Sequence, residues 1–360
     1  MTNEASQNIN FLLFKPFWNL NPETTNKALM VAMVSPSSLF LILLFLSIPF
    51  SECNLTTDYY KNSCPQLENI IRETVTSKYI SVPAAAAGTL RLFFHDCMVG
   101  GCDASVLISS NPFTKAERDA DINLALPGDA FDVIVRAKTA LELSCPGIVS
   151  CADILALATR NFVSMAGGPV YTVMLGRKDS LESNISSVEG NIPRANTTMD
   201  EIIRMFESKN FTVGEMVALS GAHTIGFSHC KEFAYRLFGY SRSTPTDPSY
   251  HPKFSAALKT LCANYKNDSD MAAFNDPMTP SKFDNMYYQN LKRGMGLLES
   301  DNGLLRHPRT NHFVDLYAFN QTAFSNDFAR AIEKLSLSGI KTGNQGEVRR
   351  KCDAFNTFQT

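Results

Sequence analysis

The chain has 360 residues, of which 44% are hydrophobic and 19% charged, so it is long and apolar enough to bury a core around a cofactor. Its formal net charge is only −2, and its Lys and Arg residues are scattered rather than clustered. Nucleic-acid binding is therefore excluded as a function class, because proteins of that class carry a basic patch that faces the phosphate backbone.

The N-terminal segment differs in composition from the rest of the chain. Its densest apolar run is residues 39–50, inside a longer stretch without charged residues. A run of about 7 to 15 apolar residues is typical of a secretory signal peptide, whereas a membrane helix needs roughly 20. Residues 1–53 are therefore predicted to be a leader and signal peptide rather than a membrane anchor. Because the run starts late, translation from Met30 or Met33 is an open alternative.

Cysteine usage points to an oxidising compartment. Eight of the nine cysteines lie at or after Cys64, and Cys53 lies at the expected cleavage boundary. Buried free thiols in a cytosolic protein are the alternative interpretation. Asn-x-Ser/Thr sequons also favour export, and the chain has six of them, at Asn54, Asn184, Asn196, Asn210, Asn267 and Asn320.

The sequence after residue 54 predicts mostly helices. Four apolar residues that follow Pro65 share one face at helical spacing: Leu67, Ile70, Ile71 and Val75. Three more helix starts have the capping spacing that satisfies backbone N–H groups of the first turn: Ser150 with Asp153, Thr198 with Glu201, and Thr212 with Glu215. The run Gly167–Pro169 is expected to end the helix that begins near Ser150.

Strand signals are few, and the clearest is Val170–Leu175. A stretch rich in Gly, Pro and Asn, Gly190–Asn196, divides the chain after residue 54 into two comparable halves. Each half contains one conspicuous histidine, and a cleft between two helical lobes is a common cofactor site. The predicted fold class is therefore mainly α.

The strongest local motif is Arg91-Leu-Phe-Phe-His95-Asp96-Cys97, which follows a run of helix-favouring alanines. Because Arg91 and His95 are four residues apart, they project from the same helical face. A neutral imidazole can accept a proton while a fixed guanidinium stabilises the developing charge. On bound peroxide, His95 would move the proton from the inner to the outer oxygen, and Arg91 would assist O–O cleavage. A partly buried histidine beside a surface arginine is the alternative interpretation.

The residues after this motif predict a cation site. Cys97 and Cys102 are close enough in sequence to close a tight loop. Around the loop lie oxygen ligands of the kind that calcium takes in large number: Asp96, Asp103 and Ser105. Backbone carbonyls of the loop glycines would add ligands, and such a site would fix the helix that carries His95. A simple polar turn is the alternative.

Together these residues resemble a known family. The motif and the following Gly100-Gly-Cys-Asp-Ala-Ser105 are similar to the distal signature of the class III plant secretory peroxidases, and the resemblance runs from about Leu55 to Cys352. It implies a two-lobed helical haem-peroxidase fold with very little β structure and with haem b, iron protoporphyrin IX, between the lobes. The implied peroxidase domain covers 54–360, with a distal lobe at about 54–190 and a proximal lobe at about 191–352.

The resemblance implies a role for each residue of the distal site. His95 is the expected acid–base group, Arg91 stabilises the transition state and Phe94 shields the haem face. Asn123 matches the asparagine that bonds the distal imidazole, which would fix one ring nitrogen as donor and leave the other as acceptor.

The proximal half resembles the family at Leu219-Ser-Gly-Ala-His223-Thr-Ile-Gly226. There the resemblance implies that His223 ligates the haem iron. Asp301 matches the carboxylate that accepts the other N–H of this histidine and makes it a stronger donor. Pro193 matches the backbone position that meets aromatic donors.

Two calcium ions are also implied by the resemblance. The first would use Asp96, Val99, Gly101, Asp103 and Ser105, with Glu117 holding an associated water. The second would use Thr224, Asp276, Thr279 and Asp284. Because Thr224 follows the predicted iron ligand, loss of the second ion is expected to loosen that ligand.

The cysteine spacing alone does not select a pairing beyond the short loop. The resemblance implies four disulfides, with Cys53 unpaired or removed with the signal: Cys64–Cys145, Cys97–Cys102, Cys151–Cys352 and Cys230–Cys262.

The implied function is reduction of hydrogen peroxide to water while phenolic and other small donors are oxidised. Lignin precursors and auxin are among the expected donors, and oxidative-stress response and hydrogen peroxide catabolism are the expected roles. The protein is expected to be a secreted monomer in the extracellular space or cell wall, with the vacuole as the other destination. No nucleic-acid partner and no stable membrane association are expected.

Two alternatives remain at this stage. An intracellular peroxidase of the ascorbate or cytochrome c kind is disfavoured by Phe94, where tryptophan would be expected, and by the cysteines and leader. A calcium-stabilised wall protein that acts only as a scaffold is disfavoured, because a scaffold does not need all five residues of the predicted catalytic site: Arg91, His95, Asn123, His223 and Asp301.

Overall fold

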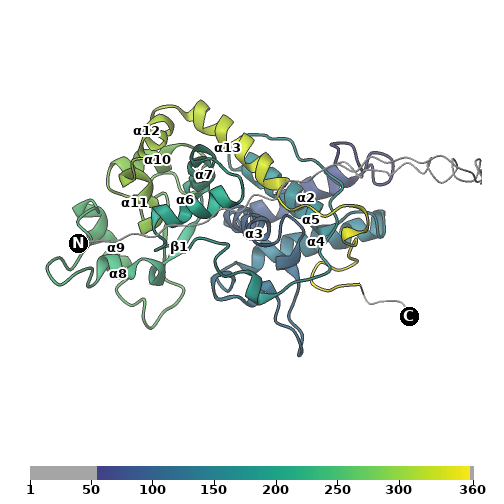
Figure 1. Cartoon of the computed structure of the whole chain (residues 1–360), viewed down its shortest axis with the longest axis horizontal. Coiled ribbons are helices and arrows are strands. Elements are labelled where there is room, and N and C mark those ends of the chain that lie inside the picture. The colour runs from purple at the N-terminus through teal and green to yellow at the C-terminus, as the bar shows by residue number, and fades with distance from the viewer. Residues whose placement is uncertain (1–54, 357–360) are drawn as a thin grey trace, which may run out of the picture. The chain divides into compact units, whose positions relative to one another are not determined.

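The computed structural model describes residues 55–356, and this part of the chain is mainly helical (Figure 1). The predicted leader and signal peptide, Cys53 and the sequon at Asn54 lie outside the described residues. The prediction of a mainly α fold is confirmed, since helices dominate and the one sheet has two short strands. None of the helices within 55–356 has the length and apolar character that a membrane span requires.

The first helical group supplies one wall of the site described below. It contains α2 (Leu67–Ser81), α3 (Ala85–Val99), α4 (Gly128–Ser144) and α5 (Cys151–Met165). Helix α3 packs against α4 and α5, and α2 packs against the same two helices. The predicted apolar face of α2 is the buried one, because Leu67, Ile71 and Val75 enter the core. The 3-10 turns η1 (Ser105–Leu107), η2 (Glu117–Asp119) and η3 (Asp121–Asn123) connect α3 to α4.

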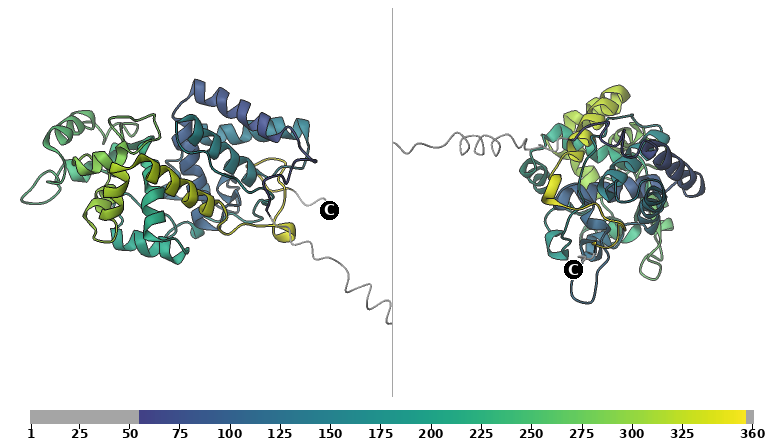
Figure 2. Two further views of the ribbon diagram at one scale, coloured as in Figure 1. Left: turned by 90° about the horizontal axis from the view of Figure 1, so that it is seen from above. Right: turned by 90° about the vertical axis from the view of Figure 1, so that its right-hand side faces the viewer.

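The second helical group follows the 3-10 turn η4 (Ile185–Ser187). Its elements are α6 (Met199–Ser208), α7 (Val213–Ser220), η5 (Gly221–Thr224), η6 (Cys230–Glu232), α8 (Ala234–Leu237), α9 (Pro252–Leu261), α10 (Met286–Lys292), α11 (Glu299–Arg306), α12 (Asn311–Phe319) and α13 (Gln321–Ser336). Helix α13 packs on α7 and also contacts α3, so it links the two groups. The left view of Figure 2 shows α13 crossing between them. The turn η7 (Gly343–Gln345) follows in the C-terminal segment.

The predicted helix starts are confirmed by their capping hydrogen bonds. The Ser150 side chain accepts from the backbone N–H of Asp153 at the start of α5. Complete capping boxes at Thr198 and Thr212 begin α6 and α7. Helix α5 ends at Met165, just before the predicted Gly-Gly-Pro stop.

The predicted strand at Val170–Leu175 is wrong. In this segment only Leu175 forms an isolated bridge, with Thr56, and the rest of the backbone has no strand partner. Its apolar residues are instead explained by burial, since Tyr171, Val173 and Leu175 enter the core. The observed sheet pairs β1 (Phe227–His229) antiparallel with β2 (Ala272–Phe274).

Four disulfides link the described residues. They join Cys64 to Cys145, Cys97 to Cys102, Cys151 to Cys352 and Cys230 to Cys262. These are the pairs that the family resemblance implies. The disulfide with the largest sequence separation, Cys151–Cys352, connects the start of α5 to the C-terminal segment. It therefore holds that segment against the first helical group.

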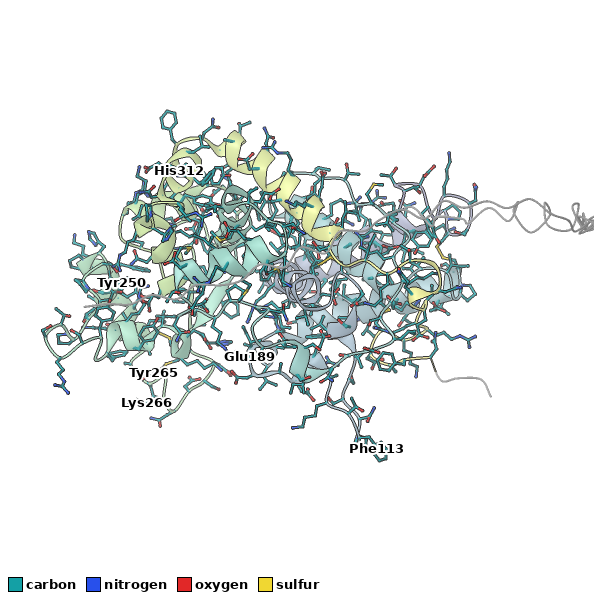
Figure 3. The ribbon with its side chains drawn as sticks, in the orientation of Figure 1. Phe113, Glu189, Tyr250, Tyr265, Lys266 and His312 are labelled. Carbon is teal, nitrogen blue, oxygen red and sulfur yellow. A yellow bond between two sulfur atoms is a disulfide. The ribbon has the colours of Figure 1, made fainter. Side chains whose placement is uncertain are left out.

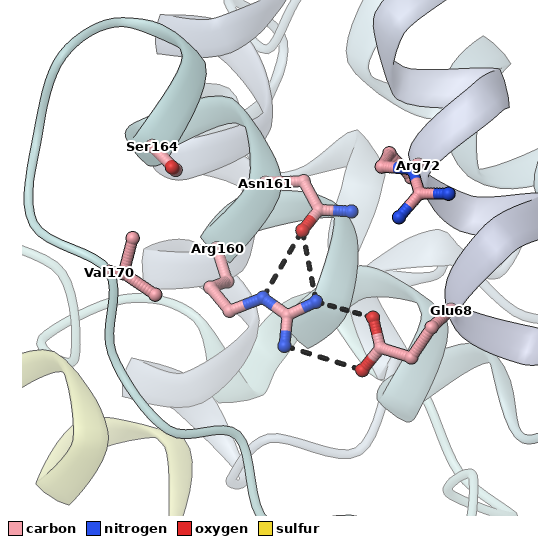
Figure 4. A pocket seen from close by; sticks show the side chains of 6 residues that line it. All are labelled: Glu68, Arg72, Arg160, Asn161, Ser164 and Val170. Carbon is pink, nitrogen blue, oxygen red and sulfur yellow. Dashed lines mark hydrogen bonds and ion pairs between the residues drawn. The ribbon is translucent and has the colours of Figure 1, made fainter.

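An ion pair at the surface joins α2 to α5. Two guanidinium nitrogens of Arg160 bond the two carboxylate oxygens of Glu68, with Nη2–Oε2 at 2.6 Å (Figure 4). The Asn161 side-chain oxygen accepts from the same guanidinium. This group lines a small surface pocket, and because the pair is partly exposed its contribution to stability is about 0–1 kcal/mol.

Replacing Thr198 by alanine should lower the free energy of unfolding by about 1 kcal/mol, because the first turn of α6 loses its capping oxygen. Chemical denaturation measures the change. Thr57→Ala is the control, since Thr57 is exposed in a turn away from any helix start. Equal stability of the Thr198 variant and the parent would contradict the capping role.

Candidate active site

One large cavity lies between the two helical groups. Its volume is about 610 Å³, and residues of α3 and η5 contribute to its lining. The sequence-predicted residues that line it are Arg91, Phe94, His95, Pro193, His223 and Asp301. Two histidines more than a hundred residues apart in sequence therefore face one space.

Helix α3 places Arg91 and His95 on the cavity side. The Arg91 Nε atom donates to His95 Nε2 at 3.2 Å, as expected for residues one turn apart. Two backbone carbonyls hold the rest of the guanidinium, those of Ala125 at 3.2 Å and Ile122 at 3.3 Å. The cation is therefore fixed at the cavity wall and does not need to reorganise when negative charge develops beside it.

The hydrogen-bond partner of His95 determines which of its ring nitrogens carries the proton. The Asn123 side-chain oxygen lies 2.6 Å from His95 Nδ1, and the Asn123 Nδ2 group donates to the Glu117 carbonyl at 2.7 Å. Because that amide oxygen can only accept, Nδ1 is the protonated nitrogen and Nε2 is the acceptor, which in this structure accepts from Arg91 Nε at the cavity wall. Burial, followed by the Arg91 charge, lowers the pKa of His95 to about 3. The ring is therefore a neutral base near pH 7.

His223 also lines the cavity, and it lies on the turn η5 directly after α7. Its Nδ1 atom lies 2.8 Å from Asp301 Oδ1, so Nε2 is the nitrogen available to a metal. The Leu298 N–H also donates to Asp301, at 3.0 Å. Burial alone would raise the pKa of Asp301, but these bonds and the His223 partner lower it. A charged carboxylate thus faces the imidazole N–H.

Tyr287 is a further member of this site that the sequence reasoning missed. Its hydroxyl donates to Asp301 Oδ1 at 2.8 Å, the same oxygen that His223 engages. Its ring meets the His223 ring edge to face, with centroids 6.0 Å apart. Tyr287 lies on α10 among other aromatic residues, and nothing in its local pattern distinguishes it from a core tyrosine.

The predicted first cation site is a cluster of buried carboxylates next to α3. Asp96, Asp103 and Glu117 are at most 4% exposed. Burial and the nearby Asp103 charge raise the pKa of Asp96 well above its ordinary value, and the same causes raise that of Glu117 to about 7. Ser105 donates to Glu117 Oε2 at 3.1 Å. Crowded buried carboxylates are stabilised by a divalent cation, so the donor set fits one.

The other predicted cation residues lie at the end of α3 and around the segment 276–284. Val99 ends α3, and Gly101 is buried at a φ of 124°. At the second site Thr279 Oγ1 lies 3.1 Å from both Asp276 Oδ2 and Asp284 Oδ1, and Thr224 accepts from the Asp284 N–H at 3.4 Å.

Within residues 55–356 no three His, Cys, Asp or Glu side chains converge as ligands of one ion. Each predicted site instead combines two carboxylates with hydroxyl or carbonyl oxygens.

Comparison with known proteins agrees with this geometry. The sequence matches the peroxidase family over residues 71–320. It is 58% identical to Peroxidase 41 of Arabidopsis thaliana over 88% of this chain and 97% of that protein. It is also 61% identical to Peroxidase 65 of the same plant, over 84% of this chain and 90% of the relative. Peroxidase 31 of that plant is 58% identical over 90% of this chain and its own full length.

The chain therefore belongs to the peroxidase family. It is an oxidoreductase that uses hydrogen peroxide to oxidise donor molecules. The family implies a haem, and the cavity fits one in size and lining. Its volume is within the range of roughly 300–1000 Å³ usual for organic ligands. Apolar side chains form much of its lining, and His223 presents a nitrogen with metal-ligand chemistry.

Replacing Asn123 by leucine should slow the reaction with hydrogen peroxide by about 10- to 100-fold, by analogy with the loss of an outer hydrogen-bond partner of a metal-ligating histidine. The His95 tautomer would no longer be fixed. Stopped-flow absorbance measures the rate, and Asn191→Leu, a change outside the cavity lining, is the control. A parental rate in the Asn123 variant would show that this bond does not tune His95.

Proposed function

We propose that this protein is a secreted class III plant peroxidase that binds haem b and oxidises phenolic and other small donors. Lignin precursors and auxin are the proposed donors, and oxidative-stress response and hydrogen peroxide catabolism the proposed roles. One observation carries the proposal: His95 and His223 line one cavity, each with Nδ1 bonded to a buried oxygen, that of Asn123 and that of Asp301.

The distal residues act on peroxide. The bound haem supplies the electrons and the iron site at which peroxide reacts. His95 Nε2 accepts the proton of the inner peroxide oxygen and delivers it to the outer oxygen, which leaves as water. Arg91 stabilises the negative charge that develops during O–O cleavage. Phe94 would shield the face of the bound haem, and its ring is held by stacking on Phe206, with centroids 6.1 Å apart.

The proximal residues tune the iron ligand. His223 Nε2 is the proposed iron ligand, and Asp301 holds the proton of Nδ1. This carboxylate increases the electron donation of the imidazole. Tyr287 fixes the carboxylate. Pro193, at the rim of the cavity, is the proposed contact for aromatic donors.

Calcium ions at two sites are proposed to stabilise the two walls. The first set is Asp96, Val99, Gly101, Asp103 and Ser105, with Glu117 bonding a coordinated water. The second set is Thr224, Asp276, Thr279 and Asp284. The burial of the carboxylates in both sets supports the assignment.

Export is proposed from several features together. Residues 1–53 act as leader and signal peptide, and residues 54–360 form the peroxidase domain, with lobes at about 54–190 and 191–352. Four disulfides support an oxidising destination, either the extracellular space and cell wall or the vacuole. The sequon asparagines within the described residues are all exposed, as glycosylation requires: Asn184, Asn196, Asn210, Asn267 and Asn320. The mature protein is proposed to be a monomer without nucleic-acid or stable membrane partners.

The test of the enzyme is the His95→Ala variant. It should retain the Soret band of the bound haem but react with hydrogen peroxide about 10²- to 10⁴-fold more slowly, because the proton carrier is gone. Stopped-flow absorbance gives the rate. His312→Ala is the matched control, since His312 is exposed on α12 (Figure 3) and is not among the residues that line the cavity. An unchanged rate would refute the role of His95, and colourless protein without guaiacol turnover would indicate a scaffold.

Removal of calcium by a chelator should lower the unfolding temperature and alter the Soret spectrum. Bound ions stabilise only the folded state, and the second site adjoins His223 through Thr224. Differential scanning calorimetry and absorbance measure the two effects, and added CaCl₂ should reverse both. Identical traces with and without chelator would contradict the calcium assignment.

The donor class is tested by turnover with coniferyl alcohol, sinapyl alcohol, ascorbate and auxin. Faster turnover of the phenolic alcohols than of ascorbate is expected. The reverse order would support the ascorbate type of peroxidase.

A further inference from the structure

A lysine from the C-terminal segment reaches the first carboxylate cluster. Lys341 Nζ lies 2.5 Å from Asp103 Oδ2, although the two residues are 238 positions apart. The Asp103 side chain is 1% exposed and the Lys341 side chain 27% exposed. Within residues 55–356, Lys341 is the cation that forms an ion pair with this cluster.

The backbone around Lys341 is held in place by close contacts with the Cys97–Cys102 loop. The Cys102 N–H donates to the Ser338 carbonyl at 3.0 Å, and the Lys178 N–H donates to the Lys341 carbonyl at 2.8 Å. A Cβ atom at Gly101 would lie 2.2 Å from the Gly339 carbonyl oxygen, so the two glycine backbones touch. Both glycines also have positive φ. Contacts between the Cys97–Cys102 loop and residues 338–341 therefore hold Lys341 next to the cluster.

The charge balance of the cluster depends on this lysine. The carboxyl groups of Asp96, Asp103 and Glu117 share this buried space. The cationic side chains next to the cluster are those of Lys341 and Arg349. Arg349, however, donates to backbone carbonyls, such as that of Ala104 at 2.8 Å, and forms no ion pair with the cluster. Lys341 is thus the direct counter-ion of these carboxylates.

Orientation of Asp103 does not require the lysine. Its Oδ1 atom already accepts from the Ser105 N–H at 3.0 Å, while Lys341 bonds the other oxygen. A fixed positive charge at this distance repels a second cation in the same space. The Lys341–Asp103 contact is therefore expected to compete with a bound cation for Asp103, and it is not needed to orient the ligands.

We propose that Lys341 is an internal counter-ion that weakens calcium binding at the first site and stabilises its carboxylates when the ion is absent. The proposal rests on the calcium site assigned under the proposed function. It gives this peroxidase a first site whose ion exchanges with the medium while the wall that carries His95 stays folded.

The direct test is titration of the haem-loaded, calcium-depleted protein with CaCl₂ in a calorimeter. Lys341→Met should bind calcium at least about tenfold more tightly than the parent at the first site, with the second site unchanged, because a nearby positive charge is removed. Lys341→Arg keeps the charge and should bind as the parent does. Tighter binding by the methionine variant alone supports competition, whereas equal or weaker binding overturns it.

Lys282→Met is the matched control for loss of one positive charge. Lys282 Nζ lies 3.4 Å from Asp284 Oδ2 at the second site, but its side chain is 68% exposed, so water screens the pair. This variant should leave the affinity of the first site unchanged. An equal gain at the first site from Lys282→Met would show a general effect of net charge and overturn the proposal.

Thermal unfolding provides a second readout that does not depend on activity. In chelator, Lys341→Met should unfold at a lower temperature than the parent, since the buried Asp103 carboxylate loses its ion-pair partner. In excess CaCl₂ its gain in unfolding temperature should exceed that of the parent. A lower stability in both conditions would indicate a purely structural lysine. If neither the parent nor Lys341→Met binds calcium at the first site, the assignment of that site is wrong. If both bind calcium with equal affinity, the site stands and only the role of Lys341 is wrong.

Discussion

The chemistry of this peroxidase depends on how two imidazole rings are held. Each ring has Nδ1 bonded to a buried oxygen, that of Asn123 for His95 and that of Asp301 for His223. Because a neutral imidazole has one donor and one acceptor nitrogen, these bonds direct both Nε2 atoms to the cavity. The partners differ in charge. The neutral amide leaves His95 Nε2 as an acceptor, while the negative carboxylate raises the basicity of the His223 ring.

Both histidines are tied to the fold through their sequence neighbours. Asp96 follows His95 and belongs to the first carboxylate cluster, and Thr224 follows His223 and bonds the Asp284 backbone of the second. Each cluster therefore begins at the residue next to one of the two rings. The position of Lys341 matters for this reason, because its ammonium group pairs with the buried Asp103 of the first cluster. The lysine at the second cluster, Lys282, is mostly exposed.

Local features of the fold were predictable because their causes are local. Capping at Ser150, Thr198 and Thr212 acts within one helical turn, and the spacing of Arg91 and His95 places them on one face wherever α3 packs. The Val170–Leu175 strand failed for the opposite reason. An apolar extended segment becomes a strand only when a partner pairs with it, and within residues 55–356 only Leu175 of this segment has a bridge partner.

The sequence by itself determined the helical class, the helix starts and, through its likeness to a known family, the residues expected at the cavity. Tertiary structure alone brought His95 and His223 onto one cavity with Asn123 and Asp301 behind them, and added Tyr287 and Lys341. The physical reason is separation along the chain. Tyr287 and Lys341 act on residues 14 and 238 positions away, and such contacts depend on how helices and loops pack rather than on any periodicity near either residue.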